Sequence, residues 1–367
     1  MNILLIPNSL KGSLSARDFC KQAAKNKSKQ NAFEFMPVSD GGDGILDVFA
    51  AAYPKAKKHS IVVIDAVYTI RTATYLILPD GKTCIIETAK ICGLGYLKKE
   101  QLNPLGATSF GVGQVIKAAI KRGAKTFYIG LGGVACNDCG AGMAAALGYE
   151  LYDDEGQQIP LGAKSLLDLR SIGKTPALLK GIKFIGLSDV TNPLLGKNGS
   201  AQVYGPQKGA NPAQVKVLGQ ALVNCCAVVK KSLQRNINKL RCGAAGAIAA
   251  GLHGFLGAEL EDGGTFILNK LNAAEKIKKC DTVITAEGKL DAQTFYGKAP
   301  LAVCKLAKKY KKPVIFICGV NEIKDFSLLK KHNIVKVIEL AKVAGSAEES
   351  FKNAAKYIPA AIKDAIK

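Results

Sequence analysis

Short apolar runs alternate with helical segments at both ends of the chain, and this alternation constrains the fold more than any other feature. The N-terminal part predicts a strand at residues 3–6, a polar loop and a helix from about Ala16. The same rhythm returns after Cys280 and continues to the C-terminus. Five strands are expected from the two ends together, at residues 3–6, 33–38, 281–286, 314–318 and 335–340. Such alternation is typical of a parallel sheet with helices on both faces.

The middle of the chain has a different character. Residues 61–65, 71–78 and 83–87 are rich in β-formers, and Asp80-Gly81 between the last two predicts a hairpin. Helices and further strands follow. We therefore predict an α/β fold with two domains. Residues 1–63 and 277–367 form a flavodoxin-like, doubly wound parallel-sheet domain, and residues 64–276 form a large inserted α/β domain that interrupts it.

The charge is unusual, with a formal net value of +22. Only six of the 51 basic residues are Arg, and the lysines are spread over helical segments. Proteins that read nucleic acid usually cluster Arg and interleave aromatic residues. We therefore expect no nucleic-acid partner, although a basic binding or regulatory protein of the same fold stays open as an alternative. The charge would also attract small anionic substrates.

Membrane, disulfide and histidine chemistry are all disfavoured. No apolar run approaches the roughly 20 residues that span a bilayer, and the start lacks the pattern of a signal peptide, so we expect a cytoplasmic protein without a membrane partner. Eleven cysteines are irregularly spaced, and the single CxxC at Cys136 and Cys139 has no second pair to complete a zinc site. The three histidines lie in unrelated contexts. Carboxylates, lysines and backbone amides must therefore carry the chemistry. The oligomeric state is a separate question, for which a homodimer stays open.

Six glycine-dense polar loops stand near strand ends, whereas a GxxxxGK[ST] P-loop and a GxGxxG after the first strand are both missing. The first loop, residues 8–15, offers Ser9, Lys11 and Ser13 at a helix start, a plausible anion site. An ordinary capped helix start is the alternative explanation.

Two loops offer acidic residues for Mg²⁺. Asp40, Gly41, Gly42 and Asp43 combine two carboxylates with glycines that let a ligand approach the backbone closely. The loop after the strand at 281–286 adds acids and a lysine that could hold metal or the substrate carboxylate. These are Glu287, Lys289 and Asp291. Plain solvated turns are the alternative for both loops.

Two further loops precede helices and suit phosphate binding. One places Thr108 and Ser109 at a helix start, and the other is the glycine-rich loop of residues 130–142. Exposed amides in such a loop form an anion-binding concavity, which the following helix dipole strengthens. The candidate ligands in it are Gly132, Gly133, Asn137 and Asp138. Tight packing of small residues is the competing explanation.

The last loop region follows the strand at 182–187. Asp189 lies where an open α/β sheet places active groups, and it could accept a substrate hydroxyl proton. Asn192, Gln207 and Lys208 lie close behind in sequence, and Lys208 could neutralise phosphate charge. A capping role for Asp189 stays open.

The amino-acid sequences of these loops, and their order along nearly the whole chain, resemble the signature blocks of the class I glycerate kinases. The blocks are SLKGSLSA, VSDGGDG, NPLGATSFGVG, GLGGVACNDCGAGM, DVTNPLLGKNGSA, YGPQKGA, GAAGAIAAGLHGFLGAEL and TAEGKLDAQTFYGKAP. The resemblance implies a flavodoxin-like domain interrupted by a second α/β domain. It also implies phosphorylation of D-glycerate, usually at the 2-hydroxyl, with ATP and Mg²⁺.

With that resemblance, the loops suggest a mechanism. We expect substrate and nucleotide to meet in a cleft between the two domains, with Mg²⁺ near Asp40, Asp43 or Glu287. Lys11 and Lys208 would hold phosphate or carboxylate, with the amides of residues 132–135. Asp189 would take the hydroxyl proton. Asp189, Lys11 and Lys208 are therefore the predicted catalytic residues.

Several positions depart from the family pattern. They include Asn8 for Asp, Val134 for Ser, Cys136 for Thr, Leu102 for Arg and Tyr296 for His. Losing Arg at Leu102 would remove a bidentate grip on a carboxylate. A kinase of the same fold that acts on another small hydroxy acid is therefore the alternative enzyme.

Overall fold

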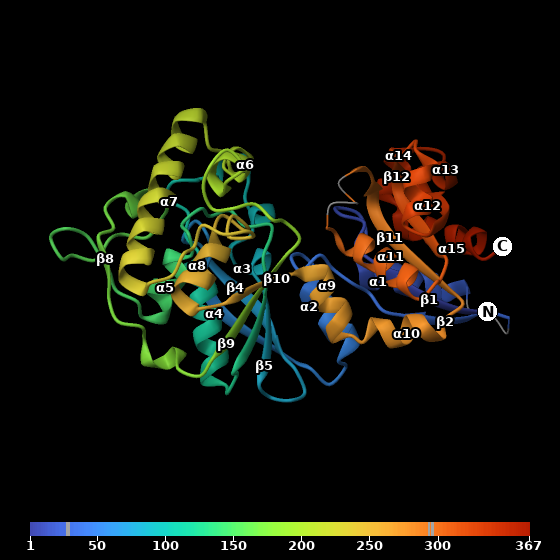
Figure 1. Cartoon of the computed structure of the whole chain (residues 1–367), viewed down its shortest axis with the longest axis horizontal. Helices are drawn as coiled ribbons and strands as arrows, with labels where there is room; N and C mark the ends of the chain where they lie inside the picture. The colour runs from blue at the N-terminus through green and yellow to red at the C-terminus, as the bar shows by residue number, and fades with distance from the viewer. Residues whose placement is uncertain (27–29, 293, 295–296) are drawn as a thin grey trace. The chain divides into compact units, whose positions relative to one another are not determined.

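The computed structural model describes residues 1–26, 30–292, 294 and 297–367. Tyr296 lies outside the described residues. The chain divides into two compact units (Figure 1). Unit 1 comprises Met1–Pro54 and Asp262–Lys367, and unit 2 comprises Lys55–Glu261. Each unit has its own sheet and is described by itself.

Unit 1 contains a five-stranded sheet in the order β13-β12-β11-β1-β2, with every neighbouring pair parallel. Its strands are β1 (Asn2–Pro7), β2 (Ala32–Phe35), β11 (Thr282–Leu290), β12 (Val314–Asn321) and β13 (Ile334–Glu339). Numbered along this unit, the order is 2-1-3-4-5, the flavodoxin-like order. The strand order reverses between β1 and β11, because β2 lies on one side of β1 and the later strands lie on the other. The carboxyl ends of the strands beside such a switch point are where α/β sheets bind ligands.

Helices cover both faces of this sheet. Ile3 and Leu5 of β1 pack with α1 and α15 in one core, while the alternate residues Leu4 and Ile6 are also fully buried. α10 and α11 contact β1 (Figure 1). The helices are α1 (Ala16–Ala23), α2 (Ile45–Ala52), α9 (Gly263–Lys270), α10 (Ala273–Lys279), α11 (Ala299–Lys309), α12 (Phe326–Lys331), α13 (Leu340–Ala344), α14 (Ala347–Lys352) and α15 (Ala354–Ala365), with a 3-10 turn η1 (Ala24–Asn26). The doubly wound prediction is confirmed.

Unit 2 contains a six-stranded mixed sheet in the order β10-β9-β6-β5-β4-β3. Its strands are β3 (Lys57–Ile64), β4 (Ile70–Ile77), β5 (Thr83–Glu87), β6 (Thr126–Gly130), β9 (Lys183–Ser188) and β10 (Glu259–Asp262), and β7 (Leu151–Tyr152) pairs separately with β8 (Ser171–Ile172). β4 is antiparallel to β3 and β5, which confirms the predicted hairpin. β5, β6 and β9 are parallel, so their carboxyl ends meet at one edge.

The helices of unit 2 pack around a single large apolar core. They are α3 (Ala89–Cys92), α4 (Phe110–Lys121), α5 (Ala141–Leu147), α6 (Ser200–Tyr204), α7 (Pro212–Leu233) and α8 (Ile248–Leu256), with 3-10 turns η2 (Leu94–Tyr96), η3 (Lys99–Gln101), η4 (Lys164–Leu167), η5 (Ala177–Leu179) and η6 (Pro206–Lys208). All eleven cysteines are free thiols.

By length and composition, α7 alone among the described helices could cross a membrane. Its buried residues instead recur at the spacing of one helical face, from Val215 through Leu218, Leu222 and Cys225 to Val229. That face packs against η4, α6 and α8. The contacts are those of a core helix of unit 2.

The unit boundaries differ in place from the domain boundaries that the sequence predicts. A boundary after residue 63 would cut β3 before its last residue, and one after residue 276 would cut α10. β3 belongs whole to unit 2, and α10 belongs whole to unit 1. The division into domains of residues 1–63 with 277–367 and residues 64–276 stays a prediction.

Candidate functional site

One group of polar residues gathers at the carboxyl ends of β1 and β11 in unit 1. Pro7 lies opposite Ala286 in the parallel register. The backbone N–H of Asn8 donates to the Ala286 carbonyl at 3.0 Å. Asn8 and Glu287 are the next residues along these two segments, so they lie side by side at the switch point of the sheet.

Asp40 ties three segments of this group together. Asn8 Nδ2 donates to Asp40 Oδ2 at 2.8 Å, and the backbone N–H of Ala299 donates to Asp40 Oδ1 at 2.6 Å. Asp40 thereby binds the first turn of α11 to the loop that follows β1. The preceding residue, Lys298, donates from Nζ to Glu287 Oε1 at 2.5 Å. Two of the predicted metal ligands, Asp40 and Glu287, thus lie around the start of α11.

Glu287 is the least satisfied member of this group. The residue is 7% exposed, and its Oε2 atom accepts no hydrogen bond from any residue that the structure describes. Burial raises the pKa of Glu287 to about 6, against the opposing effect of Lys298. A buried carboxylate oxygen without a donor is costly unless a cation, proton or polar ligand meets it.

The other predicted residues of unit 1 lie in less enclosed surroundings. Lys11 and Asp43 are exposed. The N–H of Ser9 donates to Asn8 Oδ1 at 2.8 Å, and the Ser13 hydroxyl donates to the Phe351 carbonyl. Lys289 forms an ion pair with Glu322 at 2.9 Å.

The remaining predicted positions of unit 1 lie in loops. Gly41 has φ of +91°, and its N–H donates to Ser39 Oγ at 3.3 Å, while Gly42 is half-buried. Asp291 exchanges hydrogen bonds with Thr294. Of the predicted metal ligands, the structure brings Asp40 and Glu287 together.

A second group lies in unit 2, around Asp138. This side chain is fully buried and accepts hydrogen bonds from Ser109 N at 2.7 Å, Ser109 Oγ at 2.9 Å and Gly142 N at 3.1 Å. Longer bonds come from Gly140 N and Thr108 Oγ1, each at 3.3 Å. Burial raises the pKa of Asp138, and the bonds from Ser109, Gly142 and Gly140 oppose that rise. The carboxylate joins the starts of α4 and α5, so its capacity is taken up inside the protein; a ligand role for Asp138, Ser109 and Thr108 stays a prediction.

Lys208 is buried beside the same loop. It is 2% exposed, and its Nζ donates to the Cys136 carbonyl at 2.6 Å and to Asn137 Oδ1 at 3.2 Å. Burial lowers the pKa of Lys208 to about 8. Asn137 Nδ2 is buried and has no hydrogen-bond partner among the described residues. A buried cation next to an unused amide donor provides two groups that an anion could accept bonds from.

Asp189 and its neighbours follow β9 at the same sheet edge. Burial and the charge of Asp189 together raise the pKa of Tyr204 to about 12. The Tyr204 hydroxyl donates to Asn192 Oδ1 at 2.8 Å, and Asn192 Nδ2 donates to the Asn198 carbonyl at 2.8 Å. Gln207 and Gly133 are exposed, and Gly132 is half-buried.

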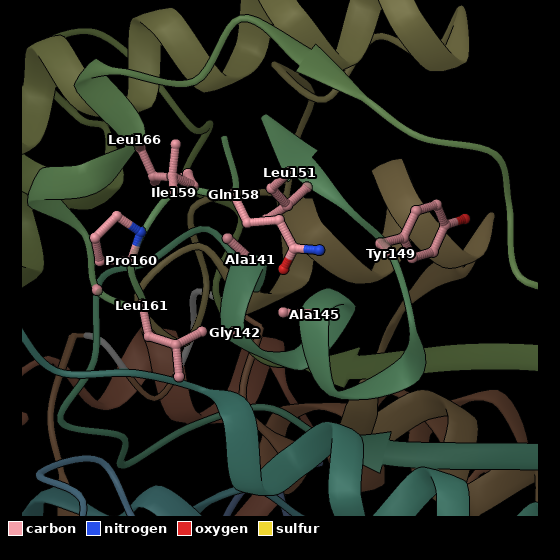
Figure 2. Close-up of a pocket in the computed structure, with 11 residues that line it drawn as sticks. Ala141, Gly142, Ala145, Tyr149, Leu151, Gln158, Ile159, Pro160, Leu161 and Leu166 are labelled. Carbon is pink, nitrogen blue, oxygen red and sulfur yellow. The ribbon is translucent and has the colours of Figure 1, made fainter. Parts of the chain in front are cut away.

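A small cavity lies beside α5, and its lining includes Gly142, which donates to Asp138. Figure 2 shows the apolar side chains of Leu151, Ile159, Leu161 and Leu166 around it. Its volume of about 20 Å³ holds no more than a water molecule. This cavity is too small for a substrate.

Comparison with known proteins places these loops in a family. The model of the glycerate kinase family matches residues 3–367. The chain belongs to the glycerate kinase family. Its sequence is 38% identical to the glycerate 2-kinase of Escherichia coli strain K12 over 96% of this chain and 94% of that protein. It is 34% identical to the glycerate kinase of Bacillus subtilis strain 168, over 99% of this chain and 96% of that protein.

A solved structure agrees with this assignment. A crystal structure from Salmonella typhimurium LT2, proposed to be a glycerate kinase 2, matches with a TM-score of 0.84 and 31% identity. The match covers 100% of this chain and 98% of that chain. The α/β fold of this glycerate kinase family member is therefore shared along the whole chain.

Three residues outside the predicted site residues contribute to these groups, and two of them, Tyr204 and Lys298, lie in or beside loops that the sequence analysis considered. Lys298 pairs with Glu287, Tyr204 orients Asn192, and Gly246 lies against the Cys136 carbonyl. Lys298 is the N-cap residue of α11, and the Pro in the first turn is a local signal for this helix start. Tyr204 and Gly246 carry no comparable local signal.

Proposed function

We propose that this protein is a glycerate kinase that transfers the γ-phosphoryl group of ATP to D-glycerate, at the 2-hydroxyl. The match to the glycerate kinase family over residues 3–367 carries the proposal. The printed name of the Escherichia coli relative, a glycerate 2-kinase, supports the choice of hydroxyl. The enzyme is then a phosphotransferase with an alcohol acceptor, and we propose that it works in the cytoplasm without a nucleic-acid partner.

The group at the switch point suits a magnesium–phosphate complex. Mg²⁺ commonly binds through one or two carboxylates together with water and substrate phosphates. Glu287 Oε2 has no protein donor among the described residues, and Asp40 lies in the same group, so these two acids would hold the ion. No cluster of three or more His, Cys, Asp or Glu fit for a metal occurs in the part of the chain that the structure describes. The bound ion would neutralise charge on the transferring phosphoryl group.

The remaining residues would position the reactants. Phosphoryl transfer depends mainly on in-line placement and on positive charge around the phosphoryl oxygens. Lys208 and the amides of Gly132 and Gly133 would hold phosphate or carboxylate, and Lys11 and Lys298 would add positive charge at the end of β1 and the start of α11. Asp189 would accept the proton of the glycerate hydroxyl.

A coupled assay of ADP release tests this function. We expect turnover with D-glycerate, loss of turnover with excess EDTA and recovery with added Mg²⁺. Enolase added to the product would consume 2-phosphoglycerate directly and so report the hydroxyl that is phosphorylated. Absence of ADP release with glycerate across a range of nucleotides and divalent ions would contradict the proposal. Light scattering on the same sample would test the homodimer, which stays a prediction.

One observation favours a second candidate, a kinase of another small hydroxy acid. Leu102, where the family pattern has Arg, lies against Gly209, the residue that follows Lys208. An apolar side chain there offers no grip on a carboxylate. The same assay with hydroxypyruvate, tartronate and lactate separates the candidates, because the alternative predicts a higher kcat/KM with one of these than with glycerate.

A further inference from the structure

A separate cavity of unit 1 has the chemistry of an anion site. It lies beside β2, the edge strand of the sheet, and has a volume of about 610 Å³. Its walls come from α1, the end of α2 and the turn between α9 and α10. The volume falls in the range of small-molecule sites. None of the six glycine-rich loops contributes a residue to its lining.

The charged residues of this lining are all basic. They are Arg17, Lys21, Lys270 and Lys276. Two acids outside the lining offset part of this charge, because Lys21 pairs with Asp18 at 2.7 Å and Lys276 pairs with Glu34. Both acids lie outside the lining, whose own charged side chains are all cations, and this favours an anionic occupant.

The rest of the lining is apolar and contains two rings. Met36 and Leu271 are buried, and the rings of Phe35 and Tyr53 are half-buried. Each ring is supported by a neighbour, since Phe35 stacks on Phe33 and Tyr53 stacks on Phe49, both with centroids 6.1 Å apart. Supported aromatic faces next to cations suit a ligand with both a flat ring and a multiply charged group.

We propose that this cavity binds a nucleoside phosphate as a second nucleotide, separate from the one used in phosphoryl transfer. The base would lie against Phe35 and Tyr53, and the phosphates would meet Arg17 and Lys270. Arg17 sits on α1 and Lys270 ends α9, so cations from two elements would contact the same phosphate chain. The proposal depends on this cavity alone and not on the identity of the phosphoryl acceptor.

Equilibrium dialysis of the full-length protein with ADP tests the proposal. The wild-type protein should bind two ADP per chain. Arg17→Ser combined with Lys270→Ser removes charge, and Ala52→Trp fills the cavity from an exposed lining position. Each variant should bind one ADP and keep its kcat. Lys279→Ser, an exposed lysine of α10 outside the lining, is the matched control and should bind two.

The outcomes are distinct. Wild-type protein that binds no ADP, or variants that bind as many ADP as wild type, would overturn the site. Loss of binding and of turnover together in Ala52→Trp would show that the cavity is the catalytic nucleotide site and would also overturn the proposal. If wild type binds one ADP that Ala52→Trp removes, while the ADP-release assay is silent for all acceptors, the cavity site stands and the glycerate kinase function fails. Unchanged circular dichroism spectra confirm that the variants are folded.

Discussion

Lys208 is the residue whose surroundings allow the most direct test of the proposed phosphate-binding role. Its ammonium group is buried and donates to the Cys136 carbonyl and to the side-chain amide oxygen of Asn137, while the Asp138 carboxylate offsets part of its charge. Burial therefore lowers its pKa to about 8, so the charge is present below that pH and is lost as the pH rises through it. A phosphate-binding role needs the charged form.

We predict that Lys208→Met lowers kcat/KM by about 100-fold, because a charge-assisted contact to the phosphoryl group disappears. In the wild type, kcat/KM should fall above pH 8, since this parameter reports the free enzyme. The variant should lack that basic limb. Lys216→Met, at an exposed position of α7, serves as the control. A wild-type basic limb that persists in Lys208→Met would assign it to another group.

Glu287 gives a prediction about stability. Its pKa is raised from 4.5 to about 6 in the folded protein, so the folded state binds a proton more readily than the unfolded state as the pH falls from about 6 toward 4.5. Glu287 therefore weakens the fold at pH 7.5, and that loss is relieved at pH 5. Relative to Glu287→Gln, the wild type should gain about 1 kcal/mol of unfolding free energy between pH 7.5 and pH 5. Urea denaturation at the two pH values measures this, and a pH-independent difference would contradict the raised pKa.

At the scale of elements, the turn before α8 packs backbone to backbone against the glycine-rich loop of residues 130–142. A Cβ on Gly246 would lie 1.8 Å from the Cys136 carbonyl oxygen and 2.5 Å from Lys208 Nζ. A Cβ on Gly251 would lie 2.3 Å from the Cys139 carbonyl oxygen. Such contacts allow no side chain.

We predict that Gly246→Ala destabilises the protein by about 3 kcal/mol or more and lowers turnover, because both the loop and Lys208 must shift. Gly156→Ala is the matched control. Gly156 also has a positive φ, of +76°, but has open space around it. That variant should lose only about 1–2 kcal/mol from the left-handed backbone and keep its turnover. Equal effects of the two substitutions would show that the close approach is unimportant.

The same turn shows where local patterns stop being informative. The Gly/Ala-rich segment of residues 243–257 reads as one buried helix, whereas α8 begins only at Ile248. Ala245, Gly246 and Ala247 all have positive φ. Ala has no intrinsic preference for that region, so the contact with the Cys136 loop, more than 100 residues earlier in the chain, imposes it. By contrast, the start of α2 at Ile45 and its apolar face follow from local signals, because glycines precede the helix and apolar residues recur along it.

At the scale of the whole molecule, each unit has a hydrophobic core of its own. The large core built around Phe127 and Ile248 draws on residues 63–258 alone, and the core around Ile3 and Ile358 draws on unit 1 alone. Unit 2 is also continuous in sequence, from Lys55 to Glu261. A continuous segment with its own sheet and core meets the requirements of a folding domain.

We therefore predict that residues 55–261 fold when expressed alone and unfold cooperatively in urea. A fragment of residues 126–261, which lacks β3, β4 and β5, is the control and should stay unfolded. Far-ultraviolet and near-ultraviolet circular dichroism would follow both. A 55–261 fragment with helical signal but without near-ultraviolet signal or a cooperative transition would show that its packing depends on the rest of the chain.

The amino-acid sequence by itself determined the α/β class, the flavodoxin-like strand pattern of the two chain ends, and the loops in which polar chemistry concentrates. These follow from periodicity and turn residues, which act over a few neighbouring positions. The tertiary structure alone decided what each polar side chain does. Asp40 binds the start of α11, 259 residues away, and Asp138 is held by donors from Ser109, 29 residues away. Glu287, by contrast, has a buried oxygen that accepts no hydrogen bond from the residues that the structure describes. A carboxylate becomes an anchor or a ligand according to the donors that distant segments bring to it, and sequence spacing does not encode those distances.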